Sequence, residues 1–231
     1  MRITFVHGNT MAKNKQPLPH ITDLPRNSYP VKFLQFGSGN FLRAFIDWMV
    51  QEANERVQLN AGVCIVQSVS RDKKLEEQKG LYTVLAKGLR NNEYTQAHYR
   101  IDCVQRIVQP QDNFDAFLHE ALNDDLQFIV SNTTESGIVF SSADASVTTL
   151  AGTFPGKLTQ LLHHRFKAGI GGKLVVIPCE LLEKNGEVLK DCVHQYITHW
   201  QLTADFTAWI ENNVTFCNTL VDRIVPGAPK G

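Results

Sequence analysis

Two glycines and an asparagine early in the chain have the types and spacing to bind a phosphate group. Gly37, Gly39 and Asn40 follow an apolar run at residues 31–36 and precede apolar residues at helical spacing. Gly37 permits a tight turn, and Gly39 lets a pyrophosphate approach the backbone. The free amides at the N-terminus of the following helix favour the negative charge of the pyrophosphate. We expect Asn40 to cap this helix. An ordinary strand-to-helix turn remains an alternative, because Leu42 stands where G-x-G-x-x-G would end.

A second segment bears on which dinucleotide would bind. Residues 61–69 are mostly apolar and predict the next strand of a βαβ unit. In an NAD site this strand ends in an acid that binds the adenosine ribose, but Asp72, the nearest acid, lies beyond the strand. Arg71 is either a ligand for a 2′-phosphate or a solvated loop arginine. These residues leave the choice between NAD and NADP open.

Two threonines could add further polar contacts. Thr133 and Thr134 follow the apolar run at residues 126–130. Their hydroxyls could donate to a cofactor phosphate or ribose, or they could satisfy local turn amides. If the strands are parallel, their carboxyl ends share one edge, and the loops at residues 37–40, 131–135 and 178–185 lie side by side.

The elements that must position these loops alternate along the chain. Strands are predicted at residues 31–36, 61–69, 126–130 and 173–178, and helices after Asn40, from Pro110, and at residues 155–166, 185–200 and 204–212. A strand pair, residues 81–85 and 94–108 about a turn at Asn91-Asn92, flanks or interrupts them. This rhythm predicts an α/β fold: a mostly parallel sheet with helices on both faces.

Composition narrows the possible partners. The chain has 231 residues, with 23 basic and 23 acidic side chains and no charged block, so nothing favours nucleic acid. No apolar run approaches the ~20 residues of a membrane span, and five cysteines without a C-x-x-C pair indicate reduced thiols in a cytoplasmic protein. The histidine spacing predicts no metal site. Residues 1–30 hold four of the nine prolines and predict an irregular lead-in.

Longer motifs resemble the mannitol dehydrogenase family of polyol-specific long-chain dehydrogenases. They are Gly37-Ser-Gly-Asn-Phe-Leu-Arg-Ala44, Gly80-Leu-Tyr-Thr83, Pro178-Cys-Glu180 and the extended Val-Asp-Arg-Ile-x-Pro signature at residues 214–226. Sugar-alcohol members of the family place an asparagine after the Cys-acid pair, whereas Leu181 follows it here. The resemblance therefore favours the hexuronate branch.

The resemblance implies a Rossmann-type domain for NAD at residues 31–215. Residues 216–231 would then lead into a helical C-terminal domain that this chain lacks. The implied reaction is reversible hydride transfer between nicotinamide and the keto carbon of a sugar acid, without a metal. Its lysine acid/base, with asparagine and histidine in a K-x-x-x-x-N-x-x-H pattern, matches no lysine here, so no catalytic residue is expected in the chain. A fructuronate or mannitol-type reductase, or a non-catalytic dinucleotide-binding module, are the alternatives.

These motifs predict two sets of contacts. The expected cofactor-binding residues are Phe36, Gly37, Ser38, Gly39, Asn40, Phe41, Arg43, Thr133 and Thr134. The expected substrate-binding residues are Glu180, Asn185, Asp222 and Arg223. For Asn185 a turn-and-cap role is the alternative. For Asp222 and Arg223 it is a salt bridge at a domain junction.

Overall fold

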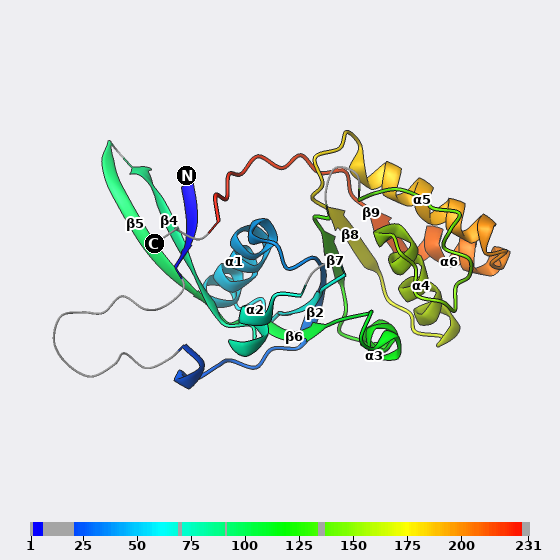
Figure 1. Cartoon of the computed structure of the whole chain (residues 1–231), viewed down its shortest axis with the longest axis horizontal. Helices are drawn as coiled ribbons and strands as arrows, with labels where there is room; N and C mark the ends of the chain where they lie inside the picture. The colour runs from blue at the N-terminus through cyan, green and yellow to red at the C-terminus, as the bar shows by residue number, and fades with distance from the viewer. Residues whose placement is uncertain (1, 7–20, 69–70, 91, 134–136, 228–231) are drawn as a thin grey trace.

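Six parallel strands form the central sheet of the chain (Figure 1). The computed structural model describes residues 2–6, 21–68, 71–90, 92–133 and 137–227. The strands lie in the order β6-β3-β2-β7-β8-β9. Numbered along the chain among themselves, this order is 3-2-1-4-5-6, which is that of the dinucleotide-binding Rossmann sheet. The predicted α/β class is confirmed.

The bounds of the elements are as follows. The sheet strands are β2 (Val31–Phe36), β3 (Gly62–Val66), β6 (Val104–Val108), β7 (Phe128–Ser131), β8 (Leu174–Pro178) and β9 (Val214–Phe216). The α-helices are α1 (Asn40–Val57), α2 (Lys73–Glu77), α3 (Phe114–His119), α4 (Phe154–Lys167), α5 (Asn185–His199) and α6 (Ala204–Asn213). Short 3-10 helices lie at Ile21–Asp23 and Glu120–Leu122, and a second sheet joins β1 (Arg2–Val6), β4 (Tyr82–Arg90) and β5 (Glu93–Ile101). The predicted domain boundary at residue 215 falls within β9 and stays a prediction.

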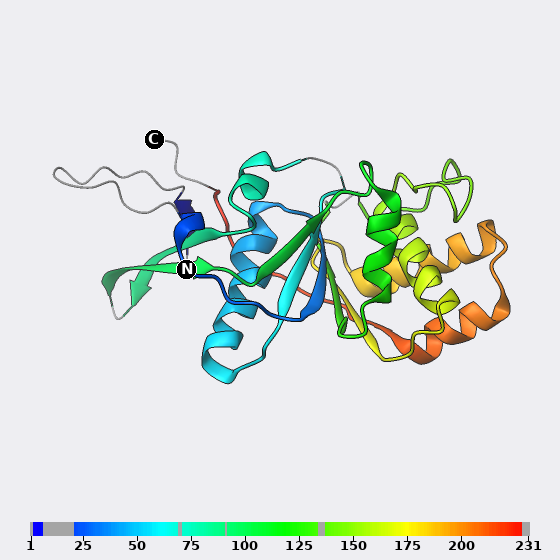
Figure 2. The same cartoon turned by 90° about the horizontal axis from the view of Figure 1, so that it is seen from below.

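Helices cover both faces of the central sheet, because parallel strands bury side chains on both sides. All five residues of β3 are buried. One apolar core joins the sheet to α3, α4, α5 and α6, and a second joins its other face to α1 and β4. Figure 2 shows α1 on one side of the strands and α4, α5 and α6 on the other.

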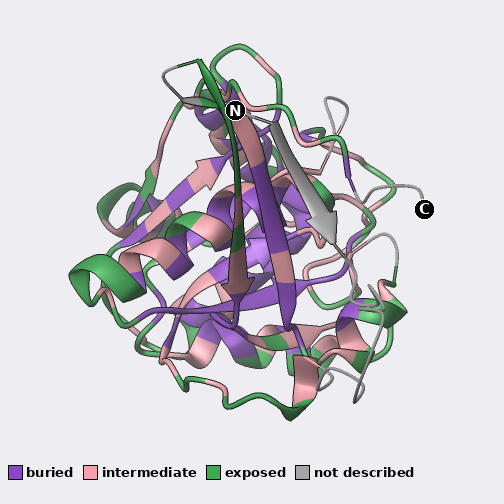
Figure 3. Cartoon of the chain, turned by 90° about the vertical axis from the view of Figure 1, so that its left-hand side faces the viewer, coloured by how far each residue is buried: buried purple, intermediate pink, exposed green. Residues whose placement is uncertain are grey.

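The strand pair predicted after the second strand is a hairpin outside the central sheet. β4 and β5 pair antiparallel, with Leu89 opposite Tyr94, and Asn92 has φ 64°; Asn91 lies outside the described residues. Figure 3 shows β4 mostly buried and β5 mostly exposed. The predicted single strand at residues 94–108 is wrong, because the strand is interrupted between the end of β5 and the start of β6. Gln51 on α1 accepts the amides of Asp102 and Cys103 at this break, both at 3.0 Å.

The predicted helix start at Pro110 is also wrong. Pro110 lies in a turn in which Asn113 N donates to Gln109 O at 3.0 Å, and α3 begins at Phe114. Asn113 caps α3 by accepting from Ala116 N. The later helices begin and end within two residues of their predicted bounds. Within the described part of the chain, no helix is both long and apolar enough to cross a membrane.

Candidate functional site at the carboxyl edge of the sheet

The two central strands, β2 and β7, end side by side at the point where the strand order reverses. Phe36 pairs with Ser131, so the turn at residues 37–39 and the residues after Ser131 leave the sheet together. The connection after β2 leads to a helix on one face, and that after β7 leads to the other face (Figure 1). In open α/β sheets, ligands bind in the crevice at such a switch point.

The two glycines of the turn differ in what surrounds them. Gly37 has φ +118°, which an L side chain rarely adopts, and its N–H donates to Val66 O at 3.0 Å. The Gln35 amide donates to Gly37 O at 3.1 Å. Gly39 has φ −63°, and a Cβ added there would meet no atom within 4 Å. Gly37 is therefore required by the backbone, whereas Gly39 faces open space.

The first turn of α1 carries no side-chain cap, contrary to the expectation for Asn40. The capping position is Gly39, whose backbone is extended, while Asn40 is already helical. Asn40 Oδ1 instead accepts from Arg43 Nη2 at 2.9 Å. By contrast, side chains of Asp72, Asn113, Thr153 and Thr203 cap α2, α3, α4 and α6. The helix whose amides a phosphate would bind thus lacks the side chain that would compete for them.

The other expected cofactor-binding residues around this turn differ in how far they are buried. Phe36 is fully buried and packs against Phe154, with ring centroids 4.9 Å apart. Ser38 and Phe41 are half-buried, and Phe41 contacts Phe45. Leu42, in place of a third glycine, is 1% exposed and fills the core beneath the turn.

Arg43 contacts Asp72 and Tyr82, which pack against α1. Its guanidinium lies 3.4 Å from Asp72 Oδ2 and 5.4 Å from the centre of the Tyr82 ring. Tyr82 Oη lies 2.7 Å from Asp47 Oδ2 and 3.1 Å from Arg43 O. A phenol has one proton, so a protonated Asp47 lets both contacts be hydrogen bonds. Burial raises the pKa of Asp47 to about 7, in agreement with this arrangement.

Glu180 joins the loops that follow β7 and β8. Its carboxylate accepts from Ser131 Oγ at 3.1 Å, Thr133 N at 2.9 Å and Thr133 Oγ1 at 3.0 Å, and the residue is 2% exposed. Thr133 is therefore satisfied by a neighbouring loop, and Thr134 lies outside the described residues. Burial, then the nearby Glu180, raises the pKa of the Cys179 thiol to about 12, which leaves it un-ionised.

Asn185 holds the segment that follows β9. Its side-chain amide donates to Pro178 O, Glu180 O and Thr219 Oγ1, and its Oδ1 accepts from Thr219 N at 2.9 Å. The residue is fully buried. It therefore begins α5 and fixes the chain at Thr219, which matches the alternative of a structural role more closely than a substrate contact.

Asp222 and Arg223 lie in an extended segment, residues 217–227, that runs from β9 back to α1 (Figure 1). Exposed and half-buried residues alternate from Asn218 to Pro226. The Arg223 guanidinium lies 4.6 Å and 5.3 Å from the ring centres of Trp48 and Phe45 on α1, whereas Asp222 is exposed. Among the described residues, these contacts replace the Asp222–Arg223 salt bridge that was the alternative prediction.

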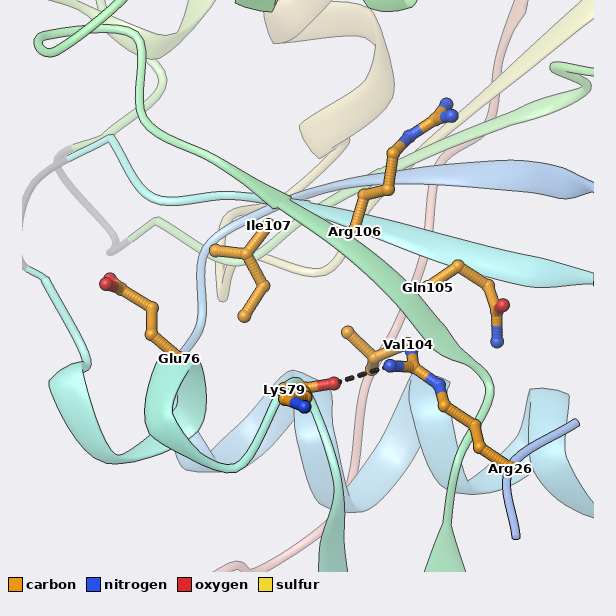
Figure 4. A pocket seen from close by; sticks show the side chains of 7 residues that line it. All are labelled: Arg26, Glu76, Lys79, Val104, Gln105, Arg106 and Ile107. Atoms are coloured by element: carbon orange, nitrogen blue, oxygen red, sulfur yellow. Dashed lines mark hydrogen bonds between the residues drawn. The ribbon is translucent and has the colours of Figure 1, made fainter. Parts of the chain in front are cut away.

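A separate hollow lies between α2 and β6, below the carboxyl edge. Its lining is Arg26, Glu76, Lys79, Val104, Gln105, Arg106 and Ile107. Figure 4 shows that the three cations do not converge: Arg26 points at the Lys79 carbonyl, 2.7 Å away, and Arg106 turns away from both. Arg106 pairs with Glu120 at 2.7 Å. Within the described residues, no group of three or more His, Cys, Asp or Glu side chains is placed to hold a metal ion.

Comparison with known proteins agrees with this geometry. A family model described as "Mannitol dehydrogenase Rossmann domain" matches residues 31–231. The altronate oxidoreductase of Bacillus subtilis (strain 168) is 43% identical over 221 residues, which are 94% of this chain and 45% of that protein. That of Yersinia enterocolitica is 44% identical over 214 residues, 90% of this chain and 44% of that protein. The chain thus spans about half the length of the curated relatives it matches.

Two solved structures share the fold. A substrate-free D-sorbitol dehydrogenase matches 83% of this chain and 43% of its own, with a TM-score of 0.70 and 19% identity. Pseudomonas fluorescens mannitol 2-dehydrogenase, in a ternary complex with NAD and D-mannitol, matches 85% of this chain and 42% of its own, with a TM-score of 0.68 and 22% identity. At these identities the likeness concerns the fold.

Proposed function

This chain belongs to the mannitol dehydrogenase family, and we propose that it is the NAD-binding part of an oxidoreductase that interconverts D-tagaturonate and D-altronate. The observation that carries the proposal is the start of α1. An uncapped helix N-terminus follows the first strand at the switch point, beside a glycine with open space around it. The relatives named altronate oxidoreductase support the choice of substrate.

The residues at this edge fit a dinucleotide. The first-turn amides of α1 would hold the pyrophosphate, and Gly39 leaves room for it to approach. Gln35 and the positive φ of Gly37 fix the turn in this shape. NAD supplies the hydride acceptor of the reaction.

The remaining chemistry needs a proton donor for the alkoxide that forms when a ketone is reduced. The family resemblance assigns this role to a lysine, and no lysine of this chain has the expected spacing. We therefore place the donor in the part of the relatives' length that this chain does not match. Substrate specificity would arise there as well.

Titration of the 231-residue chain with NADH and NADPH, followed by nucleotide fluorescence, tests the proposal. We expect saturable binding and no reduction of tagaturonate. Binding of neither nucleotide by a folded chain would refute it, and turnover by this chain alone would refute the placement of the proton donor. A version extended to the relatives' length, assayed on tagaturonate, fructuronate and fructose, separates the proposed substrate from the fructuronate and mannitol-type alternatives. No turnover of any of them would favour a non-catalytic module.

A further inference from the structure

Arg71 lies where a Rossmann fold meets the adenosine ribose. It lies in the connection between α2 and β3, which is the second strand of the central sheet along the chain. Its neighbour Asp72 does not take the place of the ribose-binding acid, because both its oxygens already have contacts. Asp72 Oδ1 accepts from Leu75 N at 3.0 Å and caps α2, and Oδ2 lies 3.4 Å from Arg43.

Two carboxylates hold the Arg71 guanidinium. Nε donates to Glu76 at 2.9 and 3.1 Å, and Nη2 lies 2.8 Å from Glu76 Oε2. Nη1 donates to Asp112 Oδ2 at 3.2 Å. Asp112 comes from the turn after β6, so the contact links two adjacent strand ends. The Nε–Nη2 fork, one of the faces with which arginine binds a phosphate, is thus occupied by Glu76, and Nη1 is engaged by Asp112.

Glu76 is itself fixed from a third element. Gln109, just after β6, donates to Glu76 Oε1 at 2.6 Å. The Glu76 side chain is 22% exposed, compared with 53% for Arg71 and 59% for Asp112. Arg71 is therefore held on one side by an anchored partner and on the other by a solvent-exposed one.

The net charge of Arg71, Glu76 and Asp112 determines which ribose substituent can bind beside them. One guanidinium and two carboxylates sum to a single negative charge, while a 2′-phosphate carries about −1.5 to −2 at pH 7. The cluster would repel that phosphate and would tolerate the neutral 2′-hydroxyl of NAD.

On the premise of the proposed NAD binding, we propose that Glu76 and Asp112 determine coenzyme specificity. By occupying the guanidinium of Arg71, they exclude the 2′-phosphate of NADP and turn a residue suited to bind it into part of an NAD-selective surface. Arg71 is thus the group that would bind the 2′-phosphate once both carboxylates are neutralised.

The test compares binding of NADH and NADPH by fluorescence titration in four forms of the full chain. These are the wild type, Glu76→Gln/Asp112→Asn, the same double variant with Arg71→Ala, and a control, Asp205→Asn/Glu211→Gln. The control removes two carboxylates from α6, where Glu211 contacts Lys190 and His194. Circular dichroism and thermal unfolding establish that each variant folds, and Asp112→Asn alone replaces the double variant if that one does not.

We expect the double variant to bind NADPH about tenfold more tightly or better, with NADH changed less than about threefold. Arg71→Ala should abolish the gain, and the α6 control should show none. Unchanged NADPH affinity contradicts the inference, and so does a gain that survives Arg71→Ala, because it would reflect net charge alone. Binding of neither nucleotide by any form contradicts the proposed function instead.

Discussion

Helices α1 and α5 begin at the same edge of the sheet and meet different partners there. Each follows a parallel strand, each has a glycine at its start, and neither has a side-chain cap. At Gly39 an added Cβ would meet nothing within 4 Å, whereas at Gly186 it would lie 2.3 Å from Cys217 O. The protein's own backbone thus takes the space beside Gly186 at the start of α5, whereas the space beside Gly39 at the start of α1 is open. A glycine at a helix start indicates close approach, and the surrounding fold decides whether chain or ligand approaches.

The largest expected effect comes from adding a side chain at Gly186, where the backbone already occupies the space. Gly186→Ala places a methyl group against backbone atoms of Cys217, which cannot rotate away as a side chain could. We expect a loss of more than about 4 kcal/mol in the free energy of unfolding, or failure to fold. Urea unfolding measures it, with Gly39→Ala as the matched variant at the open start. Similar stability of the two variants would contradict the comparison.

How well the start of each helix could be predicted depends on the sequence separation between its residues and their contact partners. The strand, turn and helix at residues 31–57 were predictable because their apolar spacing is local. The cap was misassigned by one residue, because it depends on the backbone angles of Gly39 rather than on the side chain of Asn40. At α5 the partner of Asn185 is Thr219, 34 residues later, and Glu180 binds residues 47 to 49 positions earlier. No local pattern indicates such contacts.

A polar row on α1 was hidden for the same reason. Four buried polar residues share its inner face at helical spacing, namely Arg43, Asp47, Gln51 and Asn54. In the sequence alone such a row resembles a solvated face. The partners of Asp47 and Gln51, which are Tyr82 on β4 and the amides of Asp102 and Cys103, belong to the hairpin and to the interruption after it. The row explains how the second sheet is held against α1.

Asp47 on α1 should make the free energy of unfolding of the chain depend on pH. Asn185 on α5 has no ionisable group and should not. Burial raises the native pKa of Asp47 from 3.8 to about 7. Between these values the native chain holds a proton that the unfolded chain has lost, so stability falls as pH rises. The fall amounts to at most about 4 kcal/mol and is complete above pH 7.

The measurement is urea unfolding of the wild type and Asp47→Asn from pH 4.5 to 8.5. We expect the two curves to be close near pH 4.5 and the variant to be the more stable above pH 7, because its amide cannot ionise. Asp222→Asn, at an exposed carboxyl, serves as the control. Parallel pH profiles for wild type and Asp47→Asn would show that Asp47 keeps an ordinary pKa in the folded chain.

The smallest effect, and the sharpest for function, is expected at Gly39. Gly39→Ala should leave the free energy of unfolding within about 0.5 kcal/mol, since the methyl group enters open space. The same methyl group would stand where the pyrophosphate must approach, so NADH affinity should fall about tenfold, equivalent to about 1.4 kcal/mol. Gly171→Ala is the control: it also meets nothing within 4 Å, but it precedes β8 at the opposite edge of the sheet. Unchanged NADH binding in a stable Gly39→Ala chain would mean that the open start of α1 is not where the dinucleotide lies.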